Sequence, residues 1–374
     1  MSLGTGRLNA NFDVLRLCAA GAVLVSHAVL VTTGGTWWAA HATGPFVQIG
    51  NAAVAVFFVI SGILVTQSWR GDPAMRRYLA RRALRLLPAL LVTVAVSALV
   101  VGSIVSHLTP VTYLRTPGTW AYLLNGTAFL QPYQLPGVFT HLPDTGTVNG
   151  SLWTLRYEFL CYLIVPLLVG LVTVTRRRGV LLAITAATTL VATATLTTHT
   201  GPFRDGIPWS FAGLPGAIGW DVVPLFMLMS YFLAGMCIQI WLPKLRFDGR
   251  LAALAVPLFI VVSQHPRLFP LSVAALAYAV AYFGIAARPV ARRLVALGDA
   301  SYGMYVWGFV VEQLVVVAFG PQISAIVVVA IAMPVTWTIG ILSWRLIEKP
   351  ALRFKPRAPM SDGADRRRVA VEVA

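Results

Sequence analysis

Long apolar stretches alternate with short polar segments along almost the whole chain. A helix of roughly 20 apolar residues, rising 1.5 Å per residue, crosses a bilayer core of about 30 Å. The pattern therefore predicts an all-α, polytopic membrane protein with about ten transmembrane helices, the seventh of them short. The expected spans are residues 12–33, 47–69, 80–105, 152–174, 179–198, 222–242, 251–263, 268–287, 300–319 and 323–347.

The charged residues predict an orientation for these spans. The chain has 29 Lys and Arg against 13 Asp and Glu, and a net charge of +16 in a soluble protein would suggest a nucleic-acid partner. With the N-terminus inside, 23 of the 29 cationic residues fall in inner segments, three in outer segments and three within helices. This bias is typical of positive-inside topology. It predicts that both termini are cytoplasmic, and it accounts for the basic charge without nucleic acid.

No segment between the spans is long enough to fold as a separate soluble domain. Residues 1–355 are expected to form a single transmembrane domain, followed by a disordered cytoplasmic tail at 356–374. Two outer segments, 106–151 and 199–221, are long and rich in Pro, Gly and aromatic residues. Loops of this length are commonly functional. The aromatic residues indicate either an ordered cover over a site or an interfacial aromatic belt.

The first span contains three polar residues that are costly in hydrocarbon. Arg16 and His27 are eleven positions apart, which is about three helical turns, so they share a face at heights about 16 Å apart. Asp13 lies on the same face and can pair with Arg16. His27 alone of the six histidines falls inside a predicted span. It is a functional candidate, the alternative being a ring bonded to a backbone carbonyl. Arg16 could also simply extend to the interface.

Two glutamates are expected at a similar depth to His27. Glu158, in the fourth span, is about 10 Å below the outer surface. A carboxylate beside the imidazole would fix its tautomer and raise its basicity. Glu312, in the ninth span, shares a face with Tyr302 and Tyr305. The alternative for Glu312 is a structural hydrogen bond to a helix neighbour.

Arg82 and Arg85 lie one turn apart where the third span begins on the cytoplasmic side. Guanidinium groups at this spacing suit a polyphosphate, which they bind bidentately. The alternative is that these arginines set the topology and contact anionic lipid.

Taken together, these residues resemble the acyltransferase 3 family of integral membrane acyltransferases. The resemblance covers residues 9 to 355 and rests on six motifs in order. They are "FDVLRLCAAGAVLVSHA" with Arg16 and His27, "FFVISGILV" with Ser61, "RRALRLLP" with Arg82 and Arg85, "SLWTLRYEFLCYL" with Trp153 and Glu158, "SYGMYVWGFVV" with Tyr302 and Tyr305, and "RLIEKPALRF".

The resemblance implies ten helices and transfer of an acyl group, commonly acetyl, from cytoplasmic acyl-coenzyme A to a hydroxyl. Carried over by position, Arg16 and His27 are the catalytic pair, and Arg82 and Arg85 contact the coenzyme A phosphates. One departure is that many members have a histidine where this chain has Gly308. The role of that histidine is then dispensable in this chain or is filled by another group.

The resulting hypothesis is a multi-pass O-acyltransferase of a bacterial inner membrane. It would acylate an envelope glycan, polysaccharide or glycolipid, with acyl-coenzyme A as donor and membrane lipids around it. The predicted catalytic residues are His27, Arg16 and Glu158, with Arg82 and Arg85 binding the donor. The residues predicted to line the site or support it are Asp13, Ser61, Trp153, Tyr302, Tyr305 and Glu312. No metal and no permanently bound cofactor are expected, and the sequence does not decide the oligomeric state.

Two alternatives stay open. The acceptor could be a small secondary metabolite such as a macrolide. In a different functional class, the protein could be a lipid or polysaccharide transporter whose intramembrane charges line a pathway. Only an acyltransferase would release coenzyme A.

Overall fold

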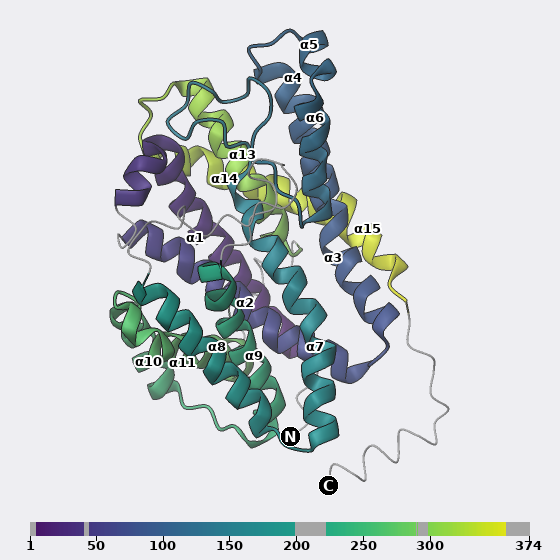
Figure 1. The fold of residues 1–374 in the computed structure, drawn as a ribbon, viewed down its shortest axis with the longest axis vertical. Coiled ribbons are helices and arrows are strands. Elements are labelled where there is room, and N and C mark those ends of the chain that lie inside the picture. The colour runs from purple at the N-terminus through teal and green to yellow at the C-terminus, as the bar shows by residue number, and fades with distance from the viewer. Residues whose placement is uncertain (1–4, 41–44, 199–221, 289, 291–297, 357–374) are drawn as a thin grey trace.

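Long helices account for most of the part of the chain that the computed structural model describes, residues 5–40, 45–198, 222–288, 290 and 298–356. No strand occurs within these ranges, which confirms the predicted all-α class. The principal helices are α1 (Thr5–Ala40), α2 (Pro45–Gly71), α3 (Met75–Val96), α7 (Leu155–Thr175), α8 (Gly179–Thr198), α9 (Val222–Trp241), α10 (Gly249–Val262), α11 (Phe269–Ala281), α13 (Ser301–Phe319) and α14 (Ala325–Ser343) (Figure 1).

Shorter elements extend or connect these helices. They are η1 (Ser97–Val101), α4 (Gly102–Val105), α5 (Pro110–Arg115), α6 (Pro117–Ala121), η2 (Tyr122–Thr127), η3 (Gly150–Thr154), η5 (Leu242–Lys244), η6 (Pro266–Leu268), η7 (Tyr282–Ala286), η8 (Trp344–Glu348), α15 (Lys349–Ala351) and η9 (Leu352–Phe354). Of these, η1, η7 and η8 are π-helical turns that continue α3, α11 and α14 without a break.

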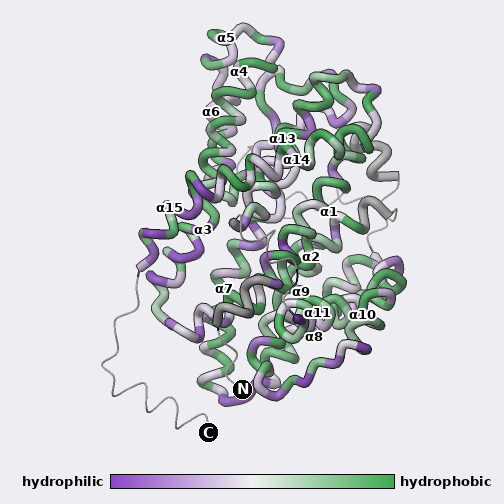
Figure 2. Tube along the Cα trace, turned by 180° about the vertical axis from the view of Figure 1, so that it is seen from behind, coloured by the Kyte–Doolittle hydropathy of each residue, from purple (hydrophilic) through white to green (hydrophobic). Residues whose placement is uncertain are grey.

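Nine helices of the described ranges are long and apolar enough to cross a bilayer. The shorter α10, with 14 residues, coincides with the seventh predicted span, which the sequence already marked as short. The protein is therefore a multi-pass membrane protein, and its orientation stays a prediction. Hydrophobic residues run along the helices, and hydrophilic residues gather around α15 and the start of α3 (Figure 2).

Two glycines bring α2 and α9 into close contact. A Cβ atom on Gly62 would lie 2.1 Å from the Phe232 carbonyl oxygen, and one on Gly235 would lie 2.3 Å from the Val59 oxygen. Only glycine permits the two helix backbones to approach this closely. Small residues at the contact are the usual means of close packing between membrane helices. The contact therefore determines which face of α2 turns toward α9 and which face remains toward the interior of the bundle.

The helix α1 lies against α2, α13 and α14. Its residues Leu24, Ala28 and Val31 are buried in one apolar cluster with Phe309 and Val316 of α13. Because 24, 28 and 31 are one turn apart, they form one stripe facing α13 and α14.

The segment 106–151, which the sequence predicts to lie outside the membrane, contains regular structure. It contains α5, α6 and η2, and the buried Tyr113 hydroxyl donates to the Ala98 carbonyl oxygen at 2.6 Å. Trp120 and Phe129 expose 52% and 40% of their surface, which suits contact with lipid headgroups or acyl chains. The other long segment, 199–221, and the tail from 357 lie outside the described residues.

The helix α3 begins at Met75, five residues before the predicted span. The predicted boundary followed hydropathy alone, whereas the arginine-rich stretch continues the same helix toward its polar end. Arg82 and Arg85, expected at the entry of the helix, therefore lie about two and three turns inside α3.

Candidate active site

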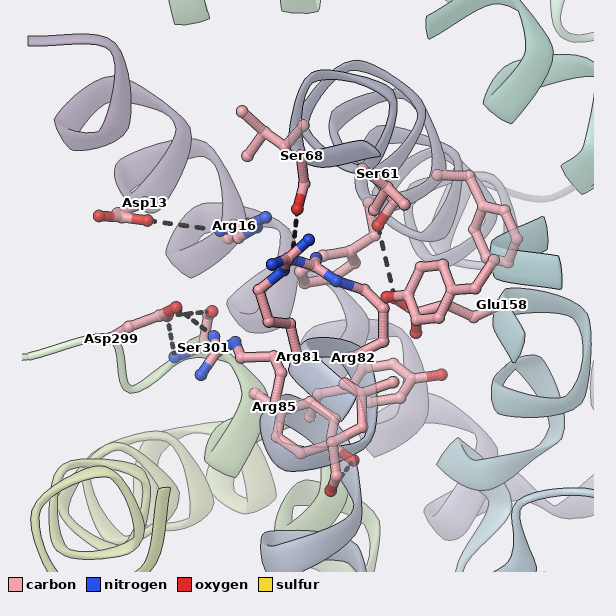
Figure 3. A pocket seen from close by; sticks show the side chains of 18 of the residues that line it. Asp13, Arg16, Ser61, Ser68, Arg81, Arg82, Arg85, Glu158, Asp299 and Ser301 are labelled. Carbon is pink, nitrogen blue, oxygen red and sulfur yellow. Dashed lines mark hydrogen bonds and ion pairs between the residues drawn. The ribbon is translucent and has the colours of Figure 1, made fainter. Parts of the chain in front are cut away.

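A cavity of about 560 Å³ lies between α1, α2, α3, α7 and α13, with η8 and the segment after η9 at its edge. Its volume is in the range of small-molecule sites. Arginine and carboxylate side chains from these elements point into it, together with Ser61 and Ser68 of α2 (Figure 3). It contains eight of the eleven residues predicted from the sequence: Asp13, Arg16, Ser61, Arg82, Arg85, Glu158, Tyr302 and Tyr305.

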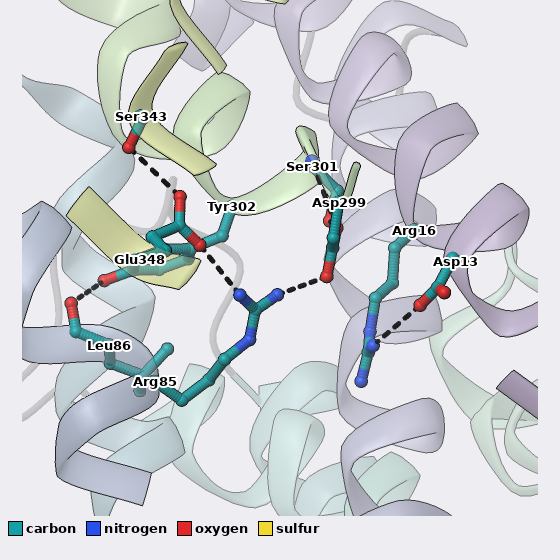
Figure 4. A network of polar contacts seen from close by, with 9 residues as sticks. All are labelled: Asp13, Arg16, Arg85, Leu86, Asp299, Ser301, Tyr302, Ser343 and Glu348. Atoms are coloured by element: carbon teal, nitrogen blue, oxygen red, sulfur yellow. Dashed lines mark hydrogen bonds and ion pairs between the residues drawn. The ribbon is translucent and has the colours of Figure 1, made fainter. Parts of the chain in front are cut away.

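Arg85 is held by two carboxylates from distant parts of the chain. One guanidinium nitrogen donates to Glu348 Oε2 at 2.7 Å, and the other donates to Asp299 Oδ2 (Figure 4). Burial alone would raise the pKa of the Asp299 carboxyl, but Arg85 and Arg16 lower it, and the net shift is downward. Arg85 is therefore a fixed element of the site, connecting α3, η8 and the start of α13.

Other arginines near the cavity also have carboxylate partners. Arg16 lies 3.4 Å from Asp13 on the next turn, as the spacing predicted. Asp72, in the turn between α2 and α3, accepts hydrogen bonds from Arg77 at 2.6 Å and from Arg81 at 2.5 Å. These hydrogen bonds lower the pKa of the Asp72 carboxyl below its ordinary range.

Arg82 differs from these arginines because no carboxylate of the described residues pairs with it. Its one hydrogen bond is to the Ser68 hydroxyl at 3.5 Å, and its buried Nε has no partner within the described part of the chain. The guanidinium lies 6.0 Å from the Tyr162 ring centroid. A cation that is partly withdrawn from water without a counter-charge is costly. Arg82 is therefore the candidate position for binding an anion.

Lys355 adds a further positive charge to the lining of the cavity. Burial lowers the pKa of the Lys355 ammonium, and the nearby Arg82 and Arg85 lower it further. With it, five cationic and three anionic side chains line the cavity. The surplus of positive charge lies where α3 meets the segment after η9.

At another part of the cavity wall, Glu158 of α7 is the acceptor of two hydroxyl groups. The Ser61 hydroxyl donates to Glu158 Oε1 at 3.4 Å, and the Tyr162 hydroxyl donates to the same oxygen. Tyr162 is placed in turn by Tyr78, whose hydroxyl donates to the Tyr162 carbonyl oxygen at 2.8 Å. Three helices thus determine where the Glu158 carboxylate lies.

Two tyrosines of α13 complete the wall. The Tyr302 hydroxyl donates to the Leu86 carbonyl oxygen at 3.0 Å, and the Tyr305 hydroxyl lies 2.5 Å from both the Ser151 carbonyl oxygen and the Thr154 hydroxyl. Both hydroxyls are engaged in joining α13 to its neighbours. Their rings, rather than free hydroxyls, shape the cavity.

His27 does not line the cavity, and no hydrogen bond joins it to Glu158 in the part of the chain that the structure describes. Its ring instead contacts Phe309 edge-on, with centroids 5.1 Å apart. Phe309 follows the cavity-lining Tyr305 by one turn of α13. The predicted His27–Glu158 pair is therefore not formed here, because the depth estimate fixed height along the bundle and not direction around it.

Trp153 and Glu312 also lie outside the cavity. Trp153 packs edge-on against Tyr157 at 5.9 Å. Glu312 is fully buried, and neither carboxylate oxygen has a hydrogen-bond partner among the described residues. The hydrogen bond to a helix neighbour that was the structural alternative for Glu312 is absent from this part of the chain.

Sequence reasoning missed Tyr162, Asp299, Glu348 and Lys355. Tyr162 follows Glu158 by four positions, which places it on the same helix face, so helical spacing could have found it. Glu348 stands inside the quoted "RLIEKPALRF" motif. The pairing of Asp299 and Glu348 with Arg85 joins residues more than 200 positions apart, and no local signal indicates it.

Comparison with known proteins relates the chain to one family. The family model described as "Acyltransferase domain" of the acyltransferase 3 family matches residues 9–345. The chain is 28% identical to "Nodulation protein 10" of Rhizobium leguminosarum bv. viciae, over 92% of this chain and 94% of that protein. It is 32% identical to an "O-acetyl transferase" of Shigella phage Sf6, over 41% of this chain and 44% of that protein.

A further relative is "Regulator of hypoxia-inducible factor 1" of Caenorhabditis elegans, 30% identical over 37% of this chain and 27% of that protein. No solved structure matches the chain. A family match over nearly the whole helical bundle, together with a charged cavity inside it, leads to one conclusion. The chain belongs to the acyltransferase 3 family of membrane acyltransferases.

Proposed function

We propose that the protein transfers an acyl group, acetyl in the first instance, from acyl-coenzyme A to a hydroxyl of an envelope glycan, polysaccharide or glycolipid. The observation that supports the donor is Arg82, a half-buried cation with no carboxylate partner among the described residues, which lines a cavity of about 560 Å³. Acetyl is supported by the phage relative whose name is "O-acetyl transferase".

The phosphates of the donor would bind where the cationic side chains gather. Arg82 offers guanidinium donors that are not engaged by a carboxylate, and Lys355 lies close to it. Phosphate groups accept charge-assisted hydrogen bonds from both residue types. Arg85 contributes positive charge there, although Asp299 and Glu348 already occupy its donors.

The thioester would then lie deeper, against the Glu158 part of the wall. The apolar Phe57 and Phe58 of α2 line the cavity together with Glu158 and exclude water from this region. A carboxylate that already accepts a hydrogen bond from a hydroxyl group can act as a base toward it. Glu158 is therefore the catalytic carboxylate of the cavity.

His27 lies one helical turn of α13 beyond the cavity-lining Tyr305, toward the predicted outer face. Under the positive-inside orientation this is the side from which an envelope acceptor arrives. We assign His27 to the acceptor hydroxyl as its general base, because a neutral imidazole can accept the proton of a hydroxyl. The bacterial inner membrane is the matching location.

The test is thiol release by the purified protein reconstituted in vesicles with extracted envelope lipids. With acetyl-coenzyme A supplied, free thiol should accumulate, and it should depend on the protein. A transporter of lipid or polysaccharide would release none. In a deletion strain, mass spectrometry of the envelope glycolipids and polysaccharides should show the loss of one acyl mass. An unchanged envelope together with no thiol release would refute the proposed function.

A further inference from the structure

Ser61 and Glu158 form the arrangement of a nucleophile with its base. Ser61 lines the cavity, and its hydroxyl donates to Glu158 Oε1 at 3.4 Å (Figure 3). The Tyr162 hydroxyl holds the same carboxylate oxygen from one helical turn away. A hydroxyl bonded to a base, with the base oriented by a third group, is the structural signature of covalent catalysis.

A packing role does not explain Ser61. The neighbouring Gly62 makes the helix contact, because its α-carbon faces the Phe232 carbonyl of α9 at a separation that excludes a side chain. Ser61 is one position along the helix, about 100° around its axis, and faces the cavity instead. Many membrane-helix serines bond to their own helix, as Ser230 does to the Phe226 carbonyl oxygen at 2.7 Å. The Ser61 hydroxyl crosses to another helix.

From this geometry we infer that Ser61 carries the acyl group as a covalent seryl ester between the two half-reactions. The inference rests on the proposed acyl-coenzyme A donor. A covalent intermediate also meets a spatial requirement, because His27 lies away from the cationic residues that would bind the donor. The donor can leave before the acceptor is engaged, so one cavity does not have to hold both substrates.

The first half-reaction is balanced by the thioester, Ser61 and Glu158 and needs no further reagent. Ser61 Oγ attacks the thioester carbonyl carbon, forming a C–O bond while the C–S bond breaks. The hydroxyl proton passes to Glu158 and then to the departing sulfur, which leaves as the coenzyme A thiol. In the second half-reaction the acceptor oxygen attacks the carbonyl carbon of the seryl ester, forming a C–O bond while the bond to Ser61 Oγ breaks. The acceptor proton passes to a base and from it to Ser61 Oγ, which restores the serine hydroxyl.

Intact-protein mass spectrometry tests this on the reconstituted full-length protein, incubated with acetyl-coenzyme A and no acceptor. The wild type should gain one acetyl mass, located by peptide mapping to the segment with Ser61, with a burst of one thiol per protein. Ser61→Ala should show neither the mass nor the burst, and its turnover in native membranes should fall by about 10²-fold or more. Glu158→Gln should slow acylation by about 10²–10⁴-fold.

Two further variants separate chemistry from folding. Ser230→Ala removes a buried serine hydroxyl outside the cavity and should acylate as the wild type does. Ser61→Cys should form a thioester that neutral hydroxylamine cleaves, whereas the seryl ester of the wild type resists it. Gel filtration and thermal unfolding would confirm that each variant is folded.

Two results overturn the inference, and they differ from failure of the proposed function. One is a wild type that turns over acetyl-coenzyme A in native membranes without ever carrying acetyl on Ser61. The other is a folded Ser61→Ala whose turnover stays within about threefold of the wild type. Absence of any thiol release by the wild type would instead overturn the donor itself, and the covalent step with it.

Discussion

At the scale of single residues, the cavity distinguishes two arginines that the sequence treats alike. Arg82 and Arg85 are one turn apart and were both predicted to contact phosphate. In the structure Arg85 is bonded to Asp299 and Glu348, whereas the one hydrogen-bond partner of Arg82 in the described part of the chain is the Ser68 hydroxyl. Their separate roles follow from partners that come from elsewhere in the chain.

This difference predicts opposite results for matched substitutions. Arg82→Gln should leave the protein folded and raise the KM for acetyl-coenzyme A by about 10- to 100-fold, because one charged hydrogen bond is lost. Arg85→Gln should lower the melting temperature, since it leaves two carboxylates buried near each other without their cation. Thiol-release kinetics and thermal unfolding of the two variants measure this, and equal effects of both substitutions would contradict it.

His27 gives the second prediction at this scale. His27→Ala should retain the fold and lose about 10²–10⁴-fold in turnover, as expected for removal of a general base. Because His27 lies outside the cavity, the variant should still take up acetyl from acetyl-coenzyme A. His265→Ala, at an exposed position next to η6, is the control. Turnover by His27→Ala equal to that of the control would remove His27 from the mechanism.

At the scale of helices, hydropathy predicts the spans well because the bilayer imposes one length on all of them. The predicted span 179–198 coincides with α8, and 152–174 differs from α7 by a few residues. The start of α3 and the π-turns were not predictable, since polar helix ends and local irregularities leave hydropathy unchanged. Eight of the cavity residues were predicted, and so was the Asp13–Arg16 pair within α1. The pairings between helices were not, because they depend on how the helices rotate against each other.

The contact between α2 and α9 yields a prediction about stability. In Gly235→Ala the new Cβ would meet the Val59 carbonyl oxygen at 2.3 Å, so the helices must separate, at a cost of about 1–3 kcal/mol. Gly170→Ala in α7 places its Cβ where nothing lies within 4 Å. It should be neutral or slightly stabilising, because alanine favours helix. Thermal unfolding should therefore separate the two variants, and equal melting temperatures would contradict the packing described.

The turn between α2 and α3 gives a pH-dependent prediction. Hydrogen bonds from Arg77 and Arg81 lower the pKa of Asp72 in the folded protein, so its stabilising contribution is complete above the ordinary carboxyl pKa of about 4. The contribution is lost as the pH falls through the lowered value. Asp72→Asn should therefore melt below the wild type at pH 7, and the difference should shrink in acid. A difference that grows in acid would reverse the sign.

At the scale of the whole molecule, the proposed function assigns the donor to the cationic cavity and the acceptor to the region of His27. The cavity reaches from the arginines of α3, expected near the cytoplasm, to Ser61 and Glu158. Beyond Tyr305, the next turn of α13 meets His27. Under the proposed function, an acyl group that moves along this line would pass from a cytoplasmic donor to an envelope acceptor without the coenzyme itself crossing the membrane.

The most direct test of this account supplies ¹³C-acetyl-coenzyme A to sealed vesicles from the face on which Arg82 is predicted to lie. The account predicts that the label appears as an acetyl ester on lipid or glycan of the opposite face. It also predicts that Arg82→Gln lowers this incorporation at limiting donor. Label that never leaves acetyl-coenzyme A, or incorporation that is unchanged in Arg82→Gln, would contradict it.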